Sequence, residues 1–276
     1  MKVYLLELLS IPEHEITKYE HVLDEDRRKR IARYQRSADK RRSFGAGMIL
    51  SYAWRKQFGE RALPKIMRNE SGKPCFFGEK MPFSLSHSGR YAACVLGTET
   101  ENALGLDIQE PRAVRGGAAE RFCSAGEREQ IRAGEDFCLI WSRKESLAKY
   151  LGSGLGGDPR LLDTAGQEAK AVSPDRDPED GILEPRLLQT AEVVSPDRES
   201  EDDMMKPHLL QTAEAVSPNS QPENDAKLHL LQTAQGSAHL WSCMTEDGYA
   251  VSVCADKPVP CSLVFLSWGQ IKKELF

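Results

Sequence analysis

The segment Gly105-Leu106-Asp107-Ile108-Gln109 offers two oxygen-bearing side chains near the end of a predicted strand. Residues two apart in a strand share a face, so Asp107 and Gln109 point the same way while Ile108 points to the core. A carboxylate beside an amide oxygen suits a hard cation such as Mg²⁺. The alternative is an ordinary solvated strand end, which this strand taken alone favours.

A second candidate lies on a helix predicted over about 136–151 and ended by Gly152. Trp141, Glu145 and Lys149 lie four apart on one stripe of this helix. A Glu followed four residues later by Lys is a common surface ion pair, worth only about 0.2–0.5 kcal/mol. Here Trp141 extends the stripe, which places the two charges at the edge of a packed face. The adjoining stripe has the spacing of a buried face, at Phe137, Ile140, Lys144, Leu147 and Leu151.

Two further features could face phosphate groups. The histidine of Ser86-His87-Ser88-Gly89 is either a structural hydrogen-bonding residue or part of a phosphate-facing loop. Residues 27–42 hold nine Lys and Arg against the single acid Asp39. This block is a solvated helical face, a nucleic-acid patch or a site for a phosphorylated small molecule. Its only aromatic residue, Tyr34, and the lack of a nucleic-acid fold signature make nucleic acid the weaker interpretation.

Short strands and a few helices must position these residues. Asp39 is expected to cap one helix, and Ser124 with Glu127 forms a capping box at the start of another. The mixture of short strands, rather than a long β-α-β series, predicts an α/β or α+β fold. The predicted strands are 1–10, 83–87, 91–96, 103–108, 239–244, 249–255 and 261–267, and the predicted helices are 13–36, 39–58, one starting at 124, and 136–151.

Composition narrows the class of protein. No window of the 276 residues approaches the roughly 18 consecutive apolar residues of a membrane span. The N-terminus is expected to be a first strand rather than a signal peptide. The seven cysteines include no Cys-x-x-Cys, which argues against a disulfide framework or a structural zinc site and for a reducing cytoplasm.

The net charge of −5 conceals a division between two parts of the chain. Residues 168–227 hold 15 acids and 6 bases, a charge of −9, which leaves +4 for the rest. The acidic part lies within a repeat of Leu-Leu-x-Thr-Ala, whose copies are at 161–165, 187–191, 209–213 and 230–234. No Phe, Trp or Tyr occurs from 151 to 240, so each unit has little apolar surface to bury. We expect a flexible acidic insert at about 158–237, with a solenoid as the alternative.

Taken together, these segments resemble the motifs of the Sfp-type 4′-phosphopantetheinyl transferases. The resemblance covers about 1–157 and 238–276, and it fails at the repeats. It implies two similar α/β halves about a pseudo-twofold axis. We expect these halves at 1–104, with contacts to the nucleotide of coenzyme A, and at 105–276, with the metal and carrier-protein motifs and the repetitive low-complexity insert. In chain order the motifs are Gly72-Lys73-Pro74, Phe83-Ser84-Leu85-Ser86-His87-Ser88-Gly89, Gly105-Leu106-Asp107-Ile108, Phe122-Cys123-Ser124-Ala125-Gly126-Glu127 and Trp141-Ser142-Arg143-Lys144-Glu145-Ser146-Leu147-Ala148-Lys149.

The resemblance also implies a reaction and a set of site residues. The reaction is transfer of the 4′-phosphopantetheine arm of coenzyme A to a serine of an acyl or peptidyl carrier protein, with release of 3′,5′-ADP. Glu145 would take the proton of the serine, directly or through a water, and Lys149 would stabilise phosphate oxygens. The implied Mg²⁺ ligands are Asp107, Gln109 and Glu145, and the implied coenzyme A contacts are Arg42, Lys73, Ser86, His87 and Lys149, with Lys29 a less certain addition.

Two positions leave alternatives open. Many family members have an acid where this chain has Gln109, whose amide oxygen brings no charge and could be replaced by a water. Glu127 could serve catalysis, or it could serve only the capping box. The alternative function is a catalytically weakened module that binds a carrier protein or coenzyme A. We further expect a cytoplasmic monomer that binds neither nucleic acid nor membrane, and carriers of fatty-acid, polyketide and nonribosomal peptide synthesis all remain open as partners.

Overall fold

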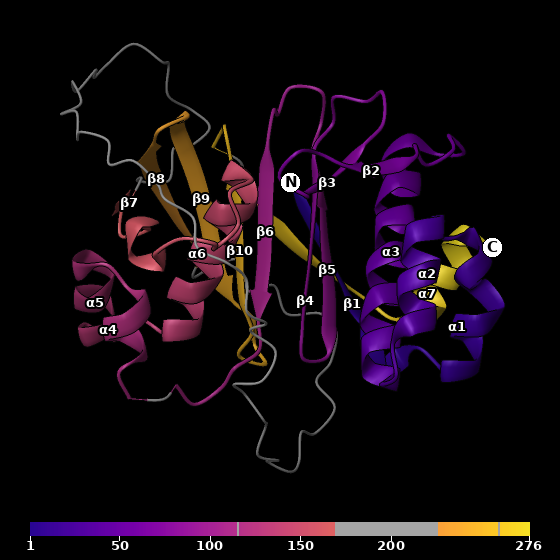
Figure 1. Cartoon of the computed structure of the whole chain (residues 1–276), viewed down its shortest axis with the longest axis horizontal. Coiled ribbons are helices and arrows are strands. Elements are labelled where there is room, and N and C mark those ends of the chain that lie inside the picture. The colour runs from indigo at the N-terminus through magenta and orange to yellow at the C-terminus, as the bar shows by residue number, and fades with distance from the viewer. Residues whose placement is uncertain (115, 169–225, 259) are drawn as a thin grey trace. The chain divides into compact units, whose positions relative to one another are not determined.

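The computed structural model describes residues 1–114, 116–168, 226–258 and 260–276 (Figure 1). They lie in one unit of the chain, Met1–Lys170 with Gln221–Phe276. The prediction of a mixed α/β fold is confirmed, and no helix in these ranges is both long enough and apolar enough to cross a membrane. The strands are β1 (Lys2–Glu7), β2 (Ile66–Arg68), β3 (Pro74–Phe76), β4 (Phe83–Ser88), β5 (Tyr91–Leu96), β6 (Leu104–Gln109), β7 (Gln167–Glu168), β8 (Lys227–Thr233), β9 (Gly236–Met244), β10 (Ala250–Ala255) and β11 (Ser262–Leu266). The helices are α1 (Glu13–Tyr19), α2 (Glu25–Arg33), α3 (Ser37–Phe58), α4 (Ala118–Phe122), α5 (Ala125–Arg132), α6 (Phe137–Leu151) and α7 (Trp268–Leu275), with 3₁₀ turns η1 (Leu8–Ser10), η2 (Glu20–Val22) and η3 (Pro159–Leu161).

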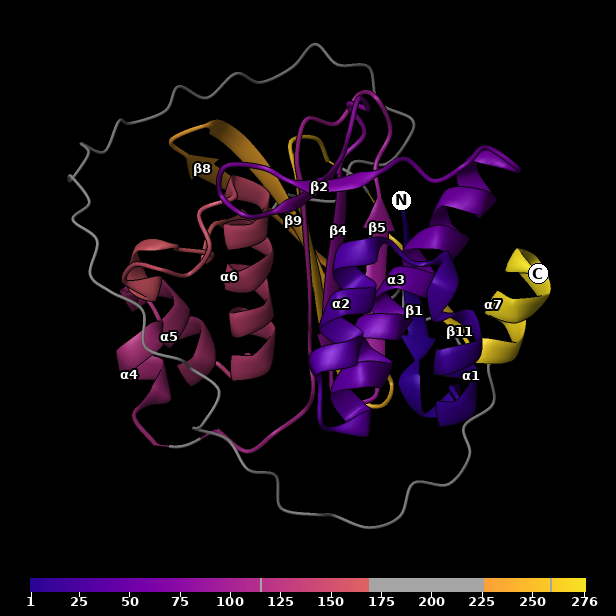
Figure 2. The same cartoon turned by 45° about the vertical axis from the view of Figure 1, so that its right-hand side comes forward.

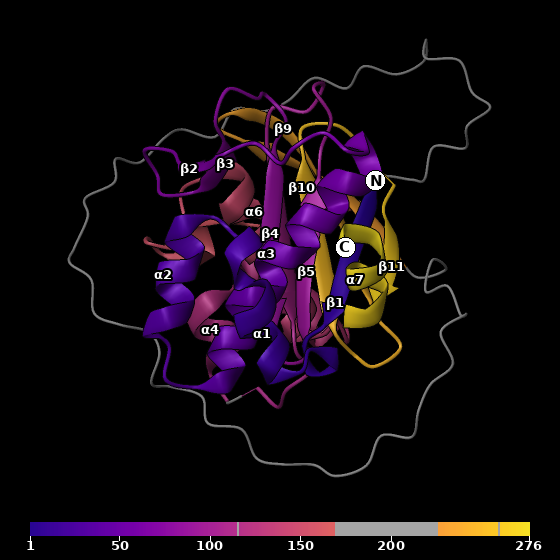
Figure 3. The ribbon, with the colours of Figure 1, turned by 90° about the vertical axis from the view of Figure 1, so that its right-hand side faces the viewer.

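The first sheet has the strand order β11-β1-β5-β4. β1 pairs in parallel with β11 and antiparallel with β5, so strands from opposite ends of the chain are neighbours (Figure 3). α3 packs on this sheet and buries Phe44 and Trp54 in the first hydrophobic core. The helix begins at Ser37 rather than at the predicted cap Asp39, and it ends as predicted at Gly59, which takes a φ of 63°.

The helix predicted over 13–36 is in fact two helices, α1 and α2, joined by η2. The break lies at Asp24, whose side chain accepts the backbone N–H of Arg27 at 2.8 Å and so caps α2. The basic run 27–30 therefore lies on a short helix of its own, which packs against α3.

The second sheet is antiparallel throughout, with the order β6-β10-β9-β8-β7. α6 packs on β6 and β10 (Figure 2). Asp136 caps this helix, and Gly152 ends it as predicted, in a left-handed conformation. Gly105 of β6 permits the close approach, because a Cβ atom there would lie 1.8 Å from the backbone oxygen of Ser146.

Serine side chains join the two sheets. Ser84, Ser86 and Ser88 recur at every second residue of β4, so they share one face of the strand. Their Oγ atoms accept backbone N–H groups of β6, from residues 106, 108 and 110, at 2.9, 3.4 and 3.0 Å. The serine hydroxyls of β4 thus accept the backbone N–H groups of β6, as carbonyl oxygens do between neighbouring strands of one sheet.

The two ends of the repeat segment belong to the fold. Gln167 of β7 pairs with Leu230 of β8, and Leu231, in the fourth repeat copy, is buried with Leu147 and Leu240. The expectation of a flexible insert over 158–237 is therefore wrong at both ends, because these copies find partners on α6 and β9. The second and third copies, 187–191 and 209–213, lie outside the described residues.

Candidate functional site

The predicted residues Ser86, Asp107 and Lys149 come together where β4, β6 and α6 meet. Asp107 is buried, and its Oδ1 accepts hydrogen bonds from Ser86 Oγ and Lys149 Nζ, both at 2.8 Å. Lys149 Nζ also lies 3.1 Å from Ser86 Oγ and 3.0 Å from the carbonyl oxygen of Leu106. The ammonium group and the hydroxyl together stabilise a charged carboxylate at this position.

Gln109 is placed as a donor toward Asp107. Its Nε2 donates to Asp107 Oδ2 at 2.8 Å, and its Oε1 accepts from the guanidinium of Arg112 at 3.1 Å. A carboxylate only accepts and a guanidinium only donates, so the two partners together fix which way the amide points. Arg112 was not predicted from the sequence, because its position three residues after Gln109, beyond the end of the strand, does not indicate a contact.

Glu145 lies one helical turn before Lys149 on α6 and is half-buried. The neighbouring Ser142 donates to the backbone oxygen of Asp107 at 3.3 Å, which ties this part of α6 to β6. Glu145 and Asp107 thus supply two carboxylates from two elements in contact. This donor set fits Mg²⁺, which proteins commonly hold with one or two carboxylates and which takes its other ligands from phosphates and water. Within the described ranges, no group of three or more His, Cys, Asp and Glu side chains is arranged to hold a metal ion.

Arg42 and His87 line a small cationic cavity of about 100 Å³ between α2, α3 and β4. Arg42 pairs with Asp39 one turn earlier on α3. Partial desolvation, followed by the positive charge of Arg42, lowers the pKa of His87 below its ordinary value of 6.5, so its ring is neutral at pH 7. The full lining is Arg27, Arg30, Tyr34, Asp39, Arg42, Ser43, Ala46 and His87.

Arg27 lines this cavity although sequence reasoning did not single it out, whereas Lys29, which it did, lies elsewhere. Arg27 is buried and donates to the backbone oxygen of Ser43 at 2.9 Å, although nothing in the basic run distinguishes it from its neighbours. Lys29, by contrast, forms an exposed ion pair with Glu25 at 2.7 Å and does not line the cavity. Helical periodicity separates these two residues, because they lie on different faces of α2.

Lys73 lines a second cavity, of about 250 Å³, together with Lys149. Its Nζ donates to the backbone oxygens of Leu104 and Lys149 at 2.7 and 2.6 Å. Burial lowers the pKa of Lys73 from 10.5 to about 8. The predicted coenzyme contacts therefore fall at two places, with Arg42 and His87 at one cavity and Lys73 at the other.

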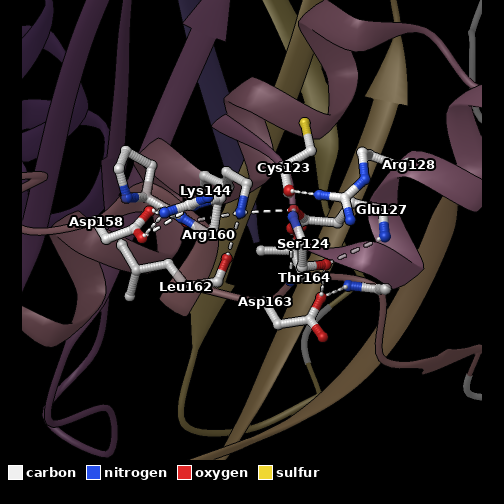
Figure 4. Close-up of polar contacts among 12 residues, drawn as sticks. Cys123, Ser124, Glu127, Arg128, Lys144, Asp158, Arg160, Leu162, Asp163 and Thr164 are labelled. Carbon is white, nitrogen blue, oxygen red and sulfur yellow. Dashed lines mark hydrogen bonds and ion pairs between the residues drawn. The ribbon is translucent and has the colours of Figure 1, made fainter. Parts of the chain in front are cut away.

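Glu127 belongs to a buried network that shares no hydrogen bond with Asp107 (Figure 4). Its Oε2 accepts the backbone N–H of Ser124 at 2.8 Å, and the Ser124 hydroxyl accepts the N–H of Glu127 at 3.2 Å. The predicted capping box is therefore confirmed. Lys144 forms an ion pair with the same carboxylate at 2.6 Å.

Comparison with known proteins agrees with these motifs. Residues 103–191 match the model of the 4′-phosphopantetheinyl transferase superfamily. The chain is 27% identical over 163 residues to the 4′-phosphopantetheinyl transferase Sfp of Bacillus subtilis, a stretch that covers 55% of this chain and 70% of Sfp. The chain is a relative of the Sfp-type 4′-phosphopantetheinyl transferases. The resemblance drawn from the motifs is confirmed as a similarity to this family.

A second relative of this transferase-like chain is matched over a shorter stretch. The chain is 39% identical over 98 residues to the 4′-phosphopantetheinyl transferase AcpT of Escherichia coli K12. That stretch covers 33% of this chain and half the length of AcpT.

Proposed function

We propose that the protein transfers the 4′-phosphopantetheine arm of coenzyme A to a serine of an acyl or peptidyl carrier protein. The observation that carries this proposal is the hydrogen-bonded cluster of Asp107, Ser86 and Lys149, with Glu145 one helical turn before Lys149 on α6. The serine oxygen bonds to the phosphorus that bears the pantetheine arm, and the bond from that phosphorus to the bridging oxygen breaks. The electron pair leaves with 3′,5′-ADP, and the serine proton passes to Glu145, directly or through a water.

Asp107 and Glu145 are the residues proposed to hold Mg²⁺. The bound cation supplies neutralisation of the charge that develops on the leaving pyrophosphate oxygens. Lys149 faces the same oxygens with its ammonium group and holds the carboxylate of Asp107 in place. Gln109, expected as a third ligand, keeps Asp107 oriented through its N–H group, so a water would have to replace it as a ligand.

The cationic cavity at Arg42 and His87 is proposed to receive the 3′-phosphate of coenzyme A. A phosphate has several strong acceptor oxygens, and the cavity offers guanidinium donors beside a neutral imidazole. Ser86 lies next to His87 on β4 and contacts the pyrophosphate side, because its hydroxyl already touches Lys149. Lys73 in the second cavity contacts the nucleotide end.

The remaining expectations about partner, compartment and symmetry are proposals of the same kind. The residues outside the acidic segment carry +4, the sign that favours association with an acidic carrier protein. None of the seven cysteines forms a disulfide, which supports the proposal of a cytoplasmic protein. We also propose that the protein is a monomer. The pseudo-twofold relation of the two halves is supported by one long helix on each sheet, α3 on the first and α6 on the second.

Transfer is tested by incubating the protein with fluorescently labelled coenzyme A and a panel of apo carrier proteins, with Mg²⁺ or with EDTA. We expect label on the carrier only when Mg²⁺ is present, and none on a carrier whose target serine is replaced by alanine. The outcome that contradicts the proposal is a folded protein that labels no carrier in the panel.

A binding module without turnover is the second candidate, and the amide at Gln109 favours it, because this position brings no charge to the metal site. In that case coenzyme A binds and no transfer follows, whereas Gln109→Glu creates activity. Normal transfer by the unaltered chain eliminates this candidate.

A further inference from the structure

Lys144 and Glu127 form an ion pair from which solvent is excluded completely (Figure 4). Both side chains have an exposed fraction of 0%, and Nζ lies 2.6 Å from Oε2. Lys144 donates further to the backbone oxygens of Pro159 and Leu162, at 2.8 and 2.7 Å. The three hydrogens of the ammonium group therefore have three acceptors.

The carboxylate of Glu127 is equally saturated. Its Oε1 accepts both the backbone N–H and the hydroxyl of Thr164, at 2.8 and 2.7 Å, while its Oε2 accepts from Ser124 and Lys144. A carboxylate with four donors and no path to solvent cannot take a proton from a carrier serine. The middle-motif acid therefore serves neither as the general base nor as a metal ligand.

The position of this pair on α6 gives it a consequence for the candidate active site. Lys144 immediately precedes Glu145, and consecutive helical residues point about 100° apart. On the β6 side, α6 is held by the contact of Ser146 with Gly105 and by the hydrogen bond of Ser142 to Asp107. The bond from Lys144 to Glu127 fixes a different side of the same turn, and it ties that side to α5 and to the segment 159–164.

We propose that the Lys144–Glu127 ion pair is a positioning device that sets the rotation of α6 and thereby holds the carboxylate of Glu145 toward the cation shared with Asp107. This inference rests on the proposed function. Lys144 touches neither substrate nor cation, and it acts through the helix that carries Glu145. The pair is held on both sides, because Lys144 donates to two backbone oxygens of the segment 159–162 and Glu127 accepts backbone N–H groups of Ser124 and Thr164.

The test measures binding of Mn²⁺, a probe for Mg²⁺ that reports on the site without turnover. Glu127→Gln and Lys144→Met are compared with Leu50→Ala, which removes buried side-chain volume from the first hydrophobic core and leaves α6 untouched. Free Mn²⁺ is quantified by electron paramagnetic resonance, well below the melting temperature of each variant. We expect the Mn²⁺ dissociation constant to rise by about tenfold or more in the two pair variants, as is typical when residues that orient a ligand are changed.

The control variant separates positioning from stability. Leu50→Ala should lower the melting temperature while it leaves the Mn²⁺ dissociation constant within about twofold of the unaltered chain. If Glu127→Gln also binds Mn²⁺ like the unaltered chain, the pair is only structural and the inference is overturned, whether or not Lys144→Met folds. Mn²⁺ binding without carrier labelling by the unaltered chain contradicts the transfer reaction alone, and failure to bind Mn²⁺ contradicts both.

Discussion

Lys144 and Lys149 lie five residues apart on α6, and each forms an ion pair with a carboxylate from another element. The two pairs differ in their exposure to solvent. In the Asp107–Lys149 pair the lysine side chain is 30% exposed and borders a cavity, whereas in the Glu127–Lys144 pair both side chains are 0% exposed. The same two residue types therefore make an open pair that can meet a ligand and a closed pair that can only hold segments together. Burial and saturation, rather than residue type, distinguish chemistry from architecture here.

The largest expected effect follows from removing the charge of the open pair. Asp107→Asn keeps the shape of the side chain, and we expect the transfer rate to fall by about a hundredfold to a thousandfold, because a preorganised charge is lost at the reacting centre. The free energy of unfolding should fall by about 1–3 kcal/mol, because the side chain is buried and an amide cannot accept all the hydrogen bonds that the carboxylate accepts. Steady-state kinetics and urea unfolding measure the two effects, and Glu246→Gln, at an exposed carboxylate of the β9–β10 turn, is the control. A near-normal rate in Asp107→Asn would remove this residue from the mechanism.

The same substitution at the two lysines gives the sharpest contrast in stability. Lys144→Met leaves Glu127 charged and buried without its partner, so the free energy of unfolding should fall by about 3–5 kcal/mol. Lys149→Met should lower it by less, because Lys149 is 30% exposed and the carboxylate of Asp107 still accepts hydrogen bonds from Ser86 and Gln109. Urea denaturation at constant pH measures both, and equal losses would refute the distinction between an open and a closed pair.

A smaller effect is expected at the cationic cavity. Arg42→Ala should raise the KM for coenzyme A by about tenfold, the usual size for loss of a charge-assisted hydrogen bond, and should leave the KM for 3′-dephospho-coenzyme A unchanged. Lys29→Ala, at the exposed pair with Glu25, is the control and should alter neither value. A similar rise for both cofactors would place the 3′-phosphate elsewhere.

Lys73 predicts a modest dependence of stability on pH. The unfolded chain keeps the Lys73 proton up to its ordinary pKa of 10.5, whereas the folded chain releases it near pH 8. Between these values the unfolded state binds more protons, so stability attributable to Lys73 should rise with pH. Melting temperatures of the unaltered chain and Lys73→Met, compared from pH 7 to about pH 10.5, isolate this contribution. The melting temperature of the unaltered chain minus that of Lys73→Met should become more positive as the pH rises. A value that falls or stays constant contradicts the lowered pKa of Lys73.

The smallest effect is expected from shortening the repeat. Replacing residues 169–225 by a short Gly-Ser linker should change the free energy of unfolding by about 1 kcal/mol or less and leave the transfer rate unaltered. Removing 158–237 should instead abolish cooperative melting, because it takes away the acceptors of Lys144 and the whole of β8. Circular dichroism during heating distinguishes the two, and loss of folding in the shorter deletion would show that the central copies are needed.

Local signals carried most of what the sequence predicted correctly. The end of α6 at Gly152 and the capping box at Ser124 each depend on a few adjacent residues, and both are confirmed. Helical spacing also placed Lys144 on a buried stripe, and it is buried. Its partner Glu127 could not be inferred, because the pair joins two helices through tertiary packing that no local pattern encodes.

The serine face of β4 shows the same limit in another way. Its alternation was visible in Phe83-Ser84-Leu85-Ser86-His87-Ser88, and the histidine drew attention to a phosphate site. These hydroxyls accept backbone N–H groups of β6, and this pairing depends on the register between two strands of different sheets. β6 lies in the other sheet, so the local pattern of β4 does not encode this register.

The pairing of β7 with β8 has a consequence for how this chain could grow. Gln167 and Leu230 are held side by side, so the two points from which the intervening chain departs stay fixed. Closing a longer connection between fixed points costs little, on the order of 0.3 kcal/mol for each added unit of about 22 residues. Copies of Leu-Leu-x-Thr-Ala could therefore accumulate between these anchors almost without penalty to the fold, which makes the length of this segment a nearly neutral character for selection.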